Sequence, residues 1–335
     1  MKKNISILVM MLLCCVMQSH AVADNVVQVV YDGTTATVTI ASNISSYVTV
    51  SSGTSSHVVI EQNSNFAGVD ATSDNEDGEI YYVLSGSSTD GSFTLIGSYK
   101  CEIDLKGLTL TNPSGPVLII LNGKRIAISS QKSTTNTLTD GSNEDYKGCI
   151  HVKGHTKLKG KGTLNVIGNS AHAIWSNEYV EVKNVTLNIT AAQKDGIHCK
   201  EYFLMESGTV NICGAGDDGI QVELDGTTST GTTTDHEDED SGNFYMEDGT
   251  LTINGYSGKA VKTDGSISYS GGTQNFDTTD VTENATSTGV ETLRVMPTNE
   301  ITEYYDLMGR SIDPSQAKGI IIVKNNGKNY KIIKK

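Results

Sequence analysis

Short runs of alternating apolar and polar residues recur through the middle of the chain at a nearly fixed interval. Each repeat has a polar turn, then a small residue, then a β-branched one. The branched residues are Ile150, Ile174, Ile197, Ile220 and Val261, at steps of 24, 23, 23 and 41 residues. The last step equals one 23-residue period plus an 18-residue insertion. A fixed period of this size is typical of a solenoid, in which each repeat buries its apolar face against its neighbours.

The period within each run is two, which indicates β-strands. Val180-Glu181-Val182 and Val210-Asn211-Ile212 alternate in this way, and Gly, Asn and Asp fill the turns between runs. No proline occurs between Pro116 and Pro297, and helical periodicity is absent. The pattern predicts an all-β chain folded as a right-handed parallel β-helix, with coils of about 23 residues.

Composition shifts divide the chain into segments. Lys2 and Lys3, an apolar run from Ile5 to Val16 and the small residues Ala21-Val22-Ala23 predict a secretory signal peptide at 1–23. We expect an N-terminal β region with the first coils at 24–84, β-helix repeats at 85–275 with an acidic insertion at 225–242, a linker at 276–298 and a small C-terminal β module at 299–335. No other apolar run is long enough to span a bilayer, so we expect no transmembrane segment.

Charge is distributed unevenly between these segments. The whole chain has a net charge of −14, but residues 24–292 carry −20 and residues 293–335 carry +4. An acidic surface repels nucleic acid and anionic membranes. It suits cations, neutral glycans, or acidic glycans bridged by a cation, and it excludes a nucleic-acid-binding function.

The cysteines give no sign of a metal motif or a disulfide framework. Export would permit disulfides. Cys101 and Cys199 are in register with inward apolar residues, so we expect buried free thiols inside the stack.

Stacked repeats place equivalent residues in columns, because neighbouring strands lie about 4.8 Å apart. The outward column that directly follows the branched residues reads His151, Trp175, His198, Gln221 and Lys262. Lys200 and Glu223 belong to the next outward column. An exposed aromatic ring flanked by polar groups is a platform for a sugar ring. We therefore predict that Trp175, His151, His198, Gln221 and Lys200 bind substrate. The alternative is that the insertion or a neighbouring loop covers the indole.

Carboxylates gather at one turn of the predicted stack. Asp195 and Asp218 should lie one coil apart, with Asp217 beside the second. Carboxylates this close repel one another unless a cation compensates them, and calcium prefers several oxygen ligands. The pattern predicts a calcium site at Asp195, Asp217 and Asp218. His172 and Lys259 continue the same column, so a salt-bridged ladder without metal is the alternative.

The case for catalysis rests on a lysine near this acidic turn. A β-helix lyase uses calcium to acidify a proton next to a uronate carboxylate and a basic side chain to remove it, and Lys259 is the weak candidate for that base. No nucleophile–base arrangement for a hydrolase is present, so the sequence favours a protein without catalysis. The acidic stretch 235–240 in the insertion is a solvated loop or a second ion site.

Three segments resemble a known family. They are Asn136-Thr137-Leu138-Thr139-Asp140-Gly141, the rung Gly162-Thr163-Leu164-Asn165-Val166 and the turn Asp217-Asp218-Gly219-Ile220. They are similar to calcium-binding, carbohydrate-binding β-helix proteins, which are secreted by bacteria and related in structure to calcium-dependent pectate lyases. The resemblance covers roughly residues 85–275. It implies bound calcium, binding to plant-type or acidic polysaccharide, and Asp195, Asp217 and Asp218 as calcium ligands. Here the acidic turn occurs in only two coils, which leaves room for fewer ions.

The C-terminal tail has a resemblance of its own. Tyr304-Tyr305-Asp306-Leu307-Met308-Gly309-Arg310, the run Lys318-Gly319-Ile320-Ile321-Ile322-Val323 and the basic end resemble the sorting module of type IX secretion. That resemblance implies recognition by outer-membrane secretion machinery. The alternative is a cap that closes the end of the solenoid.

The sequence thus predicts a secreted or outer-surface bacterial protein that binds polysaccharide on a calcium-organised face of a β-helix. A calcium-dependent uronate polysaccharide lyase is one alternative. A non-catalytic structural or adhesive surface protein is another.

Overall fold

The computed structural model describes residues 22–52, 56–63, 79–142, 145–226, 239–283, 303–305, 310–313, 319–325 and 328–334. Within these ranges the regular secondary structure is almost entirely β-strand. The helix found there, η1 (Ser42–Ile44), is a single 3-10 turn. In these same ranges no helix could cross a membrane. The predicted signal peptide, apart from its last two residues, lies outside the described residues.

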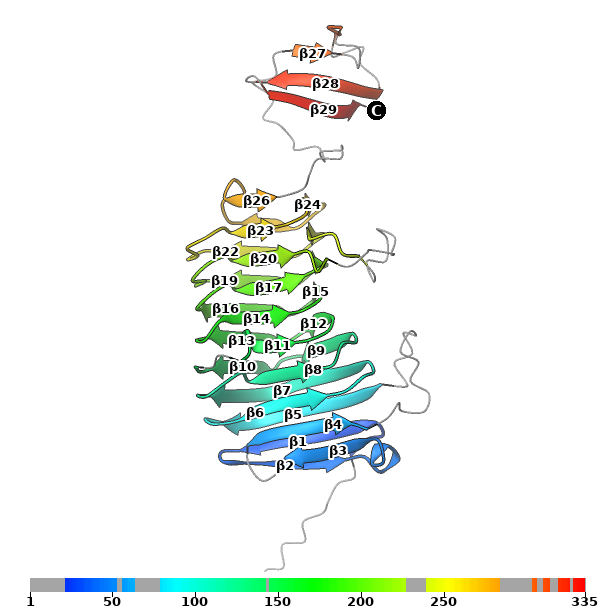
Figure 1. Cartoon of the computed structure of the whole chain (residues 1–335), viewed down its shortest axis with the longest axis vertical. Helices are drawn as coiled ribbons and strands as arrows, with labels where there is room; N and C mark the ends of the chain where they lie inside the picture. Colours follow the sequence, from blue (N-terminus) through cyan, green and yellow to red (C-terminus); the bar gives the residue numbers. More distant parts are fainter. Residues whose placement is uncertain are drawn as a thin grey trace, which may run out of the picture.

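Three faces run along a tall stack of coils (Figure 1). The first face contains the initial half of β7 (Cys101–Asn112), then β9 (Ile126–Ser130), β12 (Thr156–Gly160), β15 (Val180–Lys183), β18 (Tyr202–Met205), β21 (Asn243–Met246) and β24 (Ile267–Tyr269). The second face contains the other half of β7, then β10 (Thr135–Asp140), β13 (Thr163–Gly168), β16 (Thr186–Ala192), β19 (Thr209–Ile212), β22 (Thr250–Ile253) and β25 (Thr273–Asn275). The third face contains β3 (Val48–Ser52), β4 (His57–Gln62), β6 (Ser92–Ile96), β8 (Leu118–Leu121), β11 (Gly148–Val152), β14 (His172–Ser176), β17 (Ile197–Lys200), β20 (Ile220–Glu223), β23 (Val261–Thr263) and β26 (Val281–Glu283).

The predicted period sets the register of the third face. Ile150, Ile174, Ile197, Ile220 and Val261 pair in parallel from coil to coil, and each is 0% exposed. Burying an aliphatic side chain of this size contributes about 1.5–3 kcal/mol. The architecture confirms the predicted parallel β-helix.

The small residue before each branched residue has a steric cause. Cys149, Ala173 and Ala260 at this position are each 0% exposed. At Gly219 an added Cβ would lie 2.6 Å from the backbone oxygen of Ala260 and 2.5 Å from Ile253 Cγ2. The wall of the next coil leaves no room there, so the sequence signature reports close approach between successive coils.

The corner between the first and second faces requires a left-handed backbone. Gly160, Gly208 and Gly249 occupy it with φ of 107°, 100° and 91°. Asn184 lies at the same corner in another coil, with φ of 61°. Glycine and asparagine enter this region at low cost, which explains why they recur at this corner.

The outer side of the second face is uncharged and regular. Thr163, Thr186 and Thr209 pair in one column, and Asn165, Asn188 and Asn211 pair in the next column but one. Asn188 Nδ2 donates to Asn165 Oδ1 at 2.9 Å, and Asn211 Nδ2 donates to Asn188 Oδ1 at 2.8 Å. These bonds tie coils together without any ion pair.

Strands of the N-terminal region start the stack with less regular pairing. β1 (Val26–Asp32) pairs with β2 (Thr35–Ile40) antiparallel and with β5 (Ile80–Ser88) parallel. β5 then pairs with β7 in parallel, with a register shift between Leu84 and Gly86. The region therefore closes the lower end of the helix as irregular first coils.

The upper end of the stack extends further than expected. β26 pairs in parallel with β23, so the helix continues to Glu283, past Asn275 and into the predicted linker. In the predicted C-terminal module, β27 (Glu303–Tyr305), β28 (Gly319–Asn325) and β29 (Lys328–Lys334) form an antiparallel sheet. Residues 227–238 of the insertion and 284–302 lie outside the described residues.

The cysteines inside the stack are free, as predicted. Cys101, Cys149 and Cys199 are buried, whereas Cys213 is exposed.

Candidate functional site

The predicted outward column exists on the third face. His151 pairs with Trp175, Trp175 with His198, His198 with Gln221, and Gln221 with Lys262. Parallel pairing of β11, β14, β17, β20 and β23 brings these residues together from consecutive coils.

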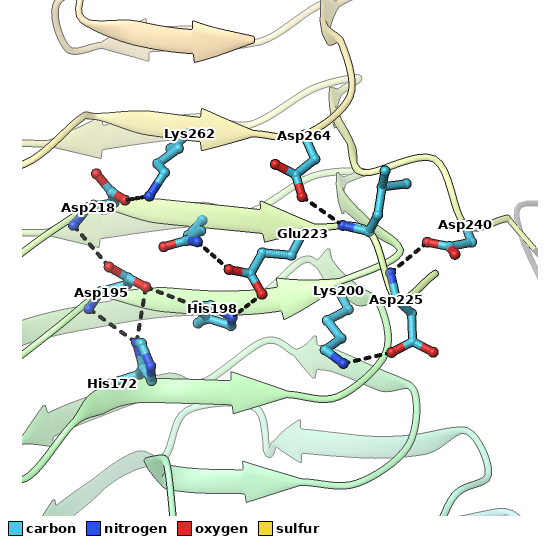
Figure 2. A network of polar contacts seen from close by, with 12 residues as sticks. His172, Asp195, His198, Lys200, Asp218, Glu223, Asp225, Asp240, Lys262 and Asp264 are labelled. Carbon is cyan, nitrogen blue, oxygen red and sulfur yellow. Dashed lines mark hydrogen bonds and ion pairs between the residues drawn. The ribbon is translucent and has the colours of Figure 1, made fainter. Parts of the chain in front are cut away.

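Asp195, in the turn before β17, is the centre of a buried polar network (Figure 2). Its Oδ2 lies 3.1 Å from His172 Nδ1 and 2.9 Å from His198 Nδ1. Its Oδ1 accepts the backbone N–H of Asp218, one coil further on, at 3.0 Å. The carboxylate thus joins side chains and backbone from three consecutive coils.

Asp218 makes equivalent contacts one coil later. Asp218 Oδ1 accepts the backbone N–H of Lys259 at 2.7 Å, and Asp218 Oδ2 lies 3.3 Å from Lys262 Nζ. Both aspartates are only 2% exposed. The column therefore contains the His–Asp–Asp–Lys ladder that was the alternative to a metal site, although Lys259 joins it through its backbone.

The pKa values of the two stacked carboxylates are shifted in opposite directions. Burial alone would raise the pKa of Asp195, but hydrogen bonds with His172 and His198 outweigh burial and bring the pKa below its usual range. Burial raises the pKa of Asp218, and the Lys259 amide and Lys262 only partly oppose it. Asp195 is therefore the better compensated carboxylate, and Asp218 is the one that a further cation would stabilise.

A carboxylate cluster at this corner has the oxygen donors that calcium prefers. Ligand atoms of Asp195, Asp217 and Asp218 lie within 4.8 Å of one another, with Asp217 exposed. Asp218 Oδ2 is buried and has no hydrogen-bond partner, although Lys262 pairs with it electrostatically. A buried carboxylate oxygen with unused lone pairs fits a cation ligand. The donor set is therefore compatible with calcium.

Trp175 is not the exposed platform that we predicted. It is only 6% exposed. The His151 ring stacks on the indole at a centroid distance of 4.4 Å, and Lys147 Nζ lies 4.9 Å from the ring centroid. The covered alternative is thus the one observed, with the cover supplied by the preceding coil and turn.

The His151 ring lies between the indole and the ring of Tyr146, which meets it edge-on at a centroid distance of 5.1 Å. Burial, followed by the charge of Lys147, lowers the pKa of His151 to about 4. The imidazole is therefore neutral at physiological pH, and its Nδ1 accepts a long hydrogen bond of 3.4 Å from the Lys147 amide.

The remaining predicted sugar-binding residues already have partners. His198 is 9% exposed, and its Nε2 lies 3.4 Å from Glu223 Oε2. Gln221 Nε2 donates to Glu223 Oε1 at 2.6 Å, and Lys200 Nζ pairs with Asp225 Oδ1 at 2.7 Å. Gln221 and Lys200 are partly exposed, whereas His198 is enclosed.

Comparison with known proteins places the chain in a family. The family model for carbohydrate-binding domain-containing proteins matches residues 72–311. The chain belongs to this family. No curated protein matches it.

A solved structure shares the fold of this family member. It is the structure of the polysaccharide lyase-like protein from C. thermocellum, determined as a gadolinium derivative. The likeness has a TM-score of 0.55 and 17% sequence identity, and covers 77% of this chain and 99% of that one. At this identity the likeness shows the fold alone.

In this member of the family, the environment of Lys259 does not suit a general base. Its Nζ pairs with Asp280 Oδ1 at 2.7 Å, and this hydrogen bond, with the charge of Asp280, raises the pKa of the amine. A lysine base needs a lowered pKa. The arrangement gives no support to the lyase alternative.

The flanks of the acidic insertion meet beside this site. The Asp225 amide donates to Asp240 Oδ1 at 2.8 Å, and Leu224 donates to Asp264 Oδ2 at 3.1 Å (Figure 2). The insertion therefore leaves and re-enters the stack at the end of β20, next to Lys200 and Glu223.

Sequence reasoning missed a second outward column, at the corner between the third and first faces. His155 stacks on Tyr179 at 4.2 Å, and Tyr179 stacks on Tyr202 at 4.7 Å. His155 Nε2 also lies 3.0 Å from Glu178 Oε2 and 3.5 Å from Glu201 Oε2. All three rings lie five residues after a branched residue. The 23-residue period could therefore have predicted this column of rings from the sequence.

Proposed function

We propose that this protein binds polysaccharide outside the cell, along the outer side of the third face. Membership of the carbohydrate-binding family over residues 72–311 carries this proposal. The partly exposed residues His151, Lys200, Gln221 and Lys262 would contact the glycan. They come from β11, β17, β20 and β23, so an extended glycan along the stack would meet polar side chains on these rungs.

Trp175 has a supporting role in this proposal. Because the indole is covered, it holds the His151 ring in place rather than meeting sugar directly. Substitution of Trp175 would remove a buried aromatic ring and lower stability, so it is a poor probe of glycan contact.

Calcium at Asp195, Asp217 and Asp218 would organise the corner next to this column. The fit rests on the clustered carboxylates and on the buried Asp218 Oδ2. Bound calcium would supply positive charge that an acidic glycan can meet on a strongly acidic stack. Asp217, the exposed member of the cluster, would be a further ligand.

Export supports the same function. The segment 1–23 has the pattern of a secretory signal, and the C-terminal tail resembles a sorting module of type IX secretion. We propose a secreted or outer-surface location, with outer-membrane secretion machinery as the partner of the tail.

The test is depletion of the protein from solution by a panel of insoluble and immobilised polysaccharides, with calcium and then with excess chelator. We expect retention on one glycan class and release by chelator. Gln221→Ala should weaken retention roughly tenfold, about 1.4 kcal/mol. Thr186→Ala, on the uncharged second face, is the matched control and should bind normally.

Two results would contradict parts of this proposal. Absence of retention on every glycan would remove polysaccharide binding and favour a structural surface protein. Retention that survives chelator, and survives Asp217→Asn, would remove calcium from the function while keeping glycan binding.

A further inference from the structure

The imidazoles of His172 and His198 converge on the carboxylate of Asp195. Calcium takes oxygen ligands, so it would not use these nitrogens. Asp195 Oδ2 is 3.1 Å from His172 Nδ1 and 2.9 Å from His198 Nδ1. All three residues are buried: His172 is 7% exposed, Asp195 2% and His198 9%. Figure 2 shows both rings turned toward the same carboxylate from neighbouring coils.

His172 Nδ1 has two contacts in this cluster that need opposite hydrogen-bonding roles. The Asp195 backbone N–H donates to His172 Nδ1 at 3.2 Å, which requires a lone pair on that nitrogen. In that tautomer the same nitrogen cannot also donate to Asp195 Oδ2, which lies 3.1 Å away. If Nδ1 is protonated instead, the bond from the amide is lost. A metal ion bound to Nδ1 and Oδ2 would use the same lone pair, so its bond to Nδ1 would replace the long hydrogen bond from the amide.

A carboxylate stands behind the second ring. His198 Nε2 lies 3.4 Å from Glu223 Oε2, on the far side of the imidazole from Asp195. Metal-binding histidines usually donate their other ring N–H to a carboxylate or carbonyl, which fixes the tautomer and the ring orientation. Glu223 is placed to do this, and with a metal bound this tautomer would leave the His198 Nδ1 lone pair available to the ion.

The donor set selects the type of ion. Two imidazole nitrogens with one carboxylate oxygen suit zinc and related first-row ions, whereas calcium takes oxygen ligands. The ligand atoms already lie within 4.8 Å of one another. Tetrahedral zinc with bonds of about 2.0–2.2 Å separates neighbouring ligand atoms by roughly 3.3–3.6 Å. The distances from Asp195 Oδ2 to the two Nδ1 atoms, 3.1 and 2.9 Å, lie within a few tenths of an ångström of that range.

The geometry points to a zinc-type metal site formed by His172, Asp195 and His198, with Glu223 as the residue that orients His198. This site is separate in chemistry from the proposed calcium cluster but shares Asp195 with it. Three protein ligands leave a further position for water or a ligand oxygen. Zinc binding here does not depend on polysaccharide binding.

The test measures zinc binding directly on the full chain after chelator treatment and dialysis. Isothermal titration with zinc chloride, in buffer with and without excess calcium, gives stoichiometry and affinity. We expect one zinc per chain that calcium does not displace, and a higher melting temperature with zinc. His172→Gln and His198→Gln should each weaken zinc binding at least tenfold.

Matched variants separate this site from its neighbours. Asp217→Asn changes the carboxylate cluster and leaves the imidazoles, so zinc affinity should be unchanged. Circular dichroism checks that each variant folds. If a histidine variant does not fold, Glu223→Gln tests the same site, with an expected loss of about tenfold.

Three results would overturn the proposal. They are no zinc binding by the folded protein, zinc affinity unchanged in both histidine variants, and displacement of zinc by calcium at comparable concentration. Loss of glycan retention without loss of zinc binding would count against the polysaccharide function alone.

Discussion

Charged side chains in this protein contact neighbouring coils as well as their own. Asp195 contacts His172 in the preceding coil, His198 in its own, and the Asp218 backbone in the next. A buried carboxylate is costly unless it is hydrogen-bonded and paired, and each of these contacts offsets that cost. The residue types in the column are therefore linked, and changing one alters its neighbours above and below.

His155 provides a pH test at the residue scale. Burial alone would lower its pKa, but the carboxylates of Glu178 and Glu201 outweigh burial and raise the pKa to about 9. The raised pKa means that the folded protein holds this proton more tightly than the unfolded chain, in which the pKa is about 6.5. The stabilisation is therefore complete below about pH 6.5 and is lost as pH rises through 9.

The expected loss is up to about 3 kcal/mol of unfolding free energy between about pH 6.5 and 9.5. Urea unfolding of wild type and His155→Gln over this range measures it, and the variant should lack this part of the pH dependence. His57→Gln, at a more exposed ion pair, is the control. Parallel pH profiles for wild type and His155→Gln would show that His155 does not hold an extra proton.

At the scale of the element, each coil is limited by how closely the next one approaches. The second face joins coils through an uncharged amide ladder, whereas the third face joins them through buried ions and close-packed turns. Small residues are required where a turn touches the wall of the following coil. This contact explains why a small residue recurs before each branched residue in the sequence.

Gly219→Ala tests this limit. The added Cβ would meet the backbone oxygen of Ala260 at 2.6 Å, so the turn before β20 must shift, and we expect a loss of about 1–3 kcal/mol. Gly123→Ala is the matched control, because its Cβ meets nothing within 4 Å. That variant should stay within about 0.5 kcal/mol of wild type. Equal stability of the two variants would show that the turn tolerates a side chain.

At the scale of the whole molecule, the chain combines an acidic stack with a basic tail that lies outside the repeat pattern. Residues 24–292 carry −20 and residues 293–335 carry +4. The stack has its own terminal strand, β26, paired on β23. In a solenoid, stability is approximately a sum over coils and their interfaces, so a separate module contributes little to it.

Deletion of residues 299–335 distinguishes a sorting module from a cap. As a separate module, its loss should leave the melting temperature of the stack within about 2 °C of the full chain. Differential scanning calorimetry at matched protein concentration measures this. A clear fall in melting temperature, or aggregation of the shortened chain, would identify the tail as the cap of the solenoid.

The candidate site shows how far sequence reasoning reached. The column from His151 to Lys262 and the stacked Asp195 and Asp218 followed from the period alone, because parallel pairing keeps equivalent residues adjacent. The burial of Trp175 did not follow, because Lys147 and His151 reach it from another coil. The contact of His172 with Asp195 was expected as the alternative ladder, but the contact of His198 with the same carboxylate was not.

The sequence by itself determined the β-helix, its coil length, its inward residues and the alignment of its outward columns. These depend on short-range alternation and a constant period, both of which are local properties of the chain. Only the tertiary structure decided which outward side chains are partly exposed, which are covered and which pair with one another. Those outcomes depend on side-chain directions across coils and on turns that break the period, and no local pattern specifies them.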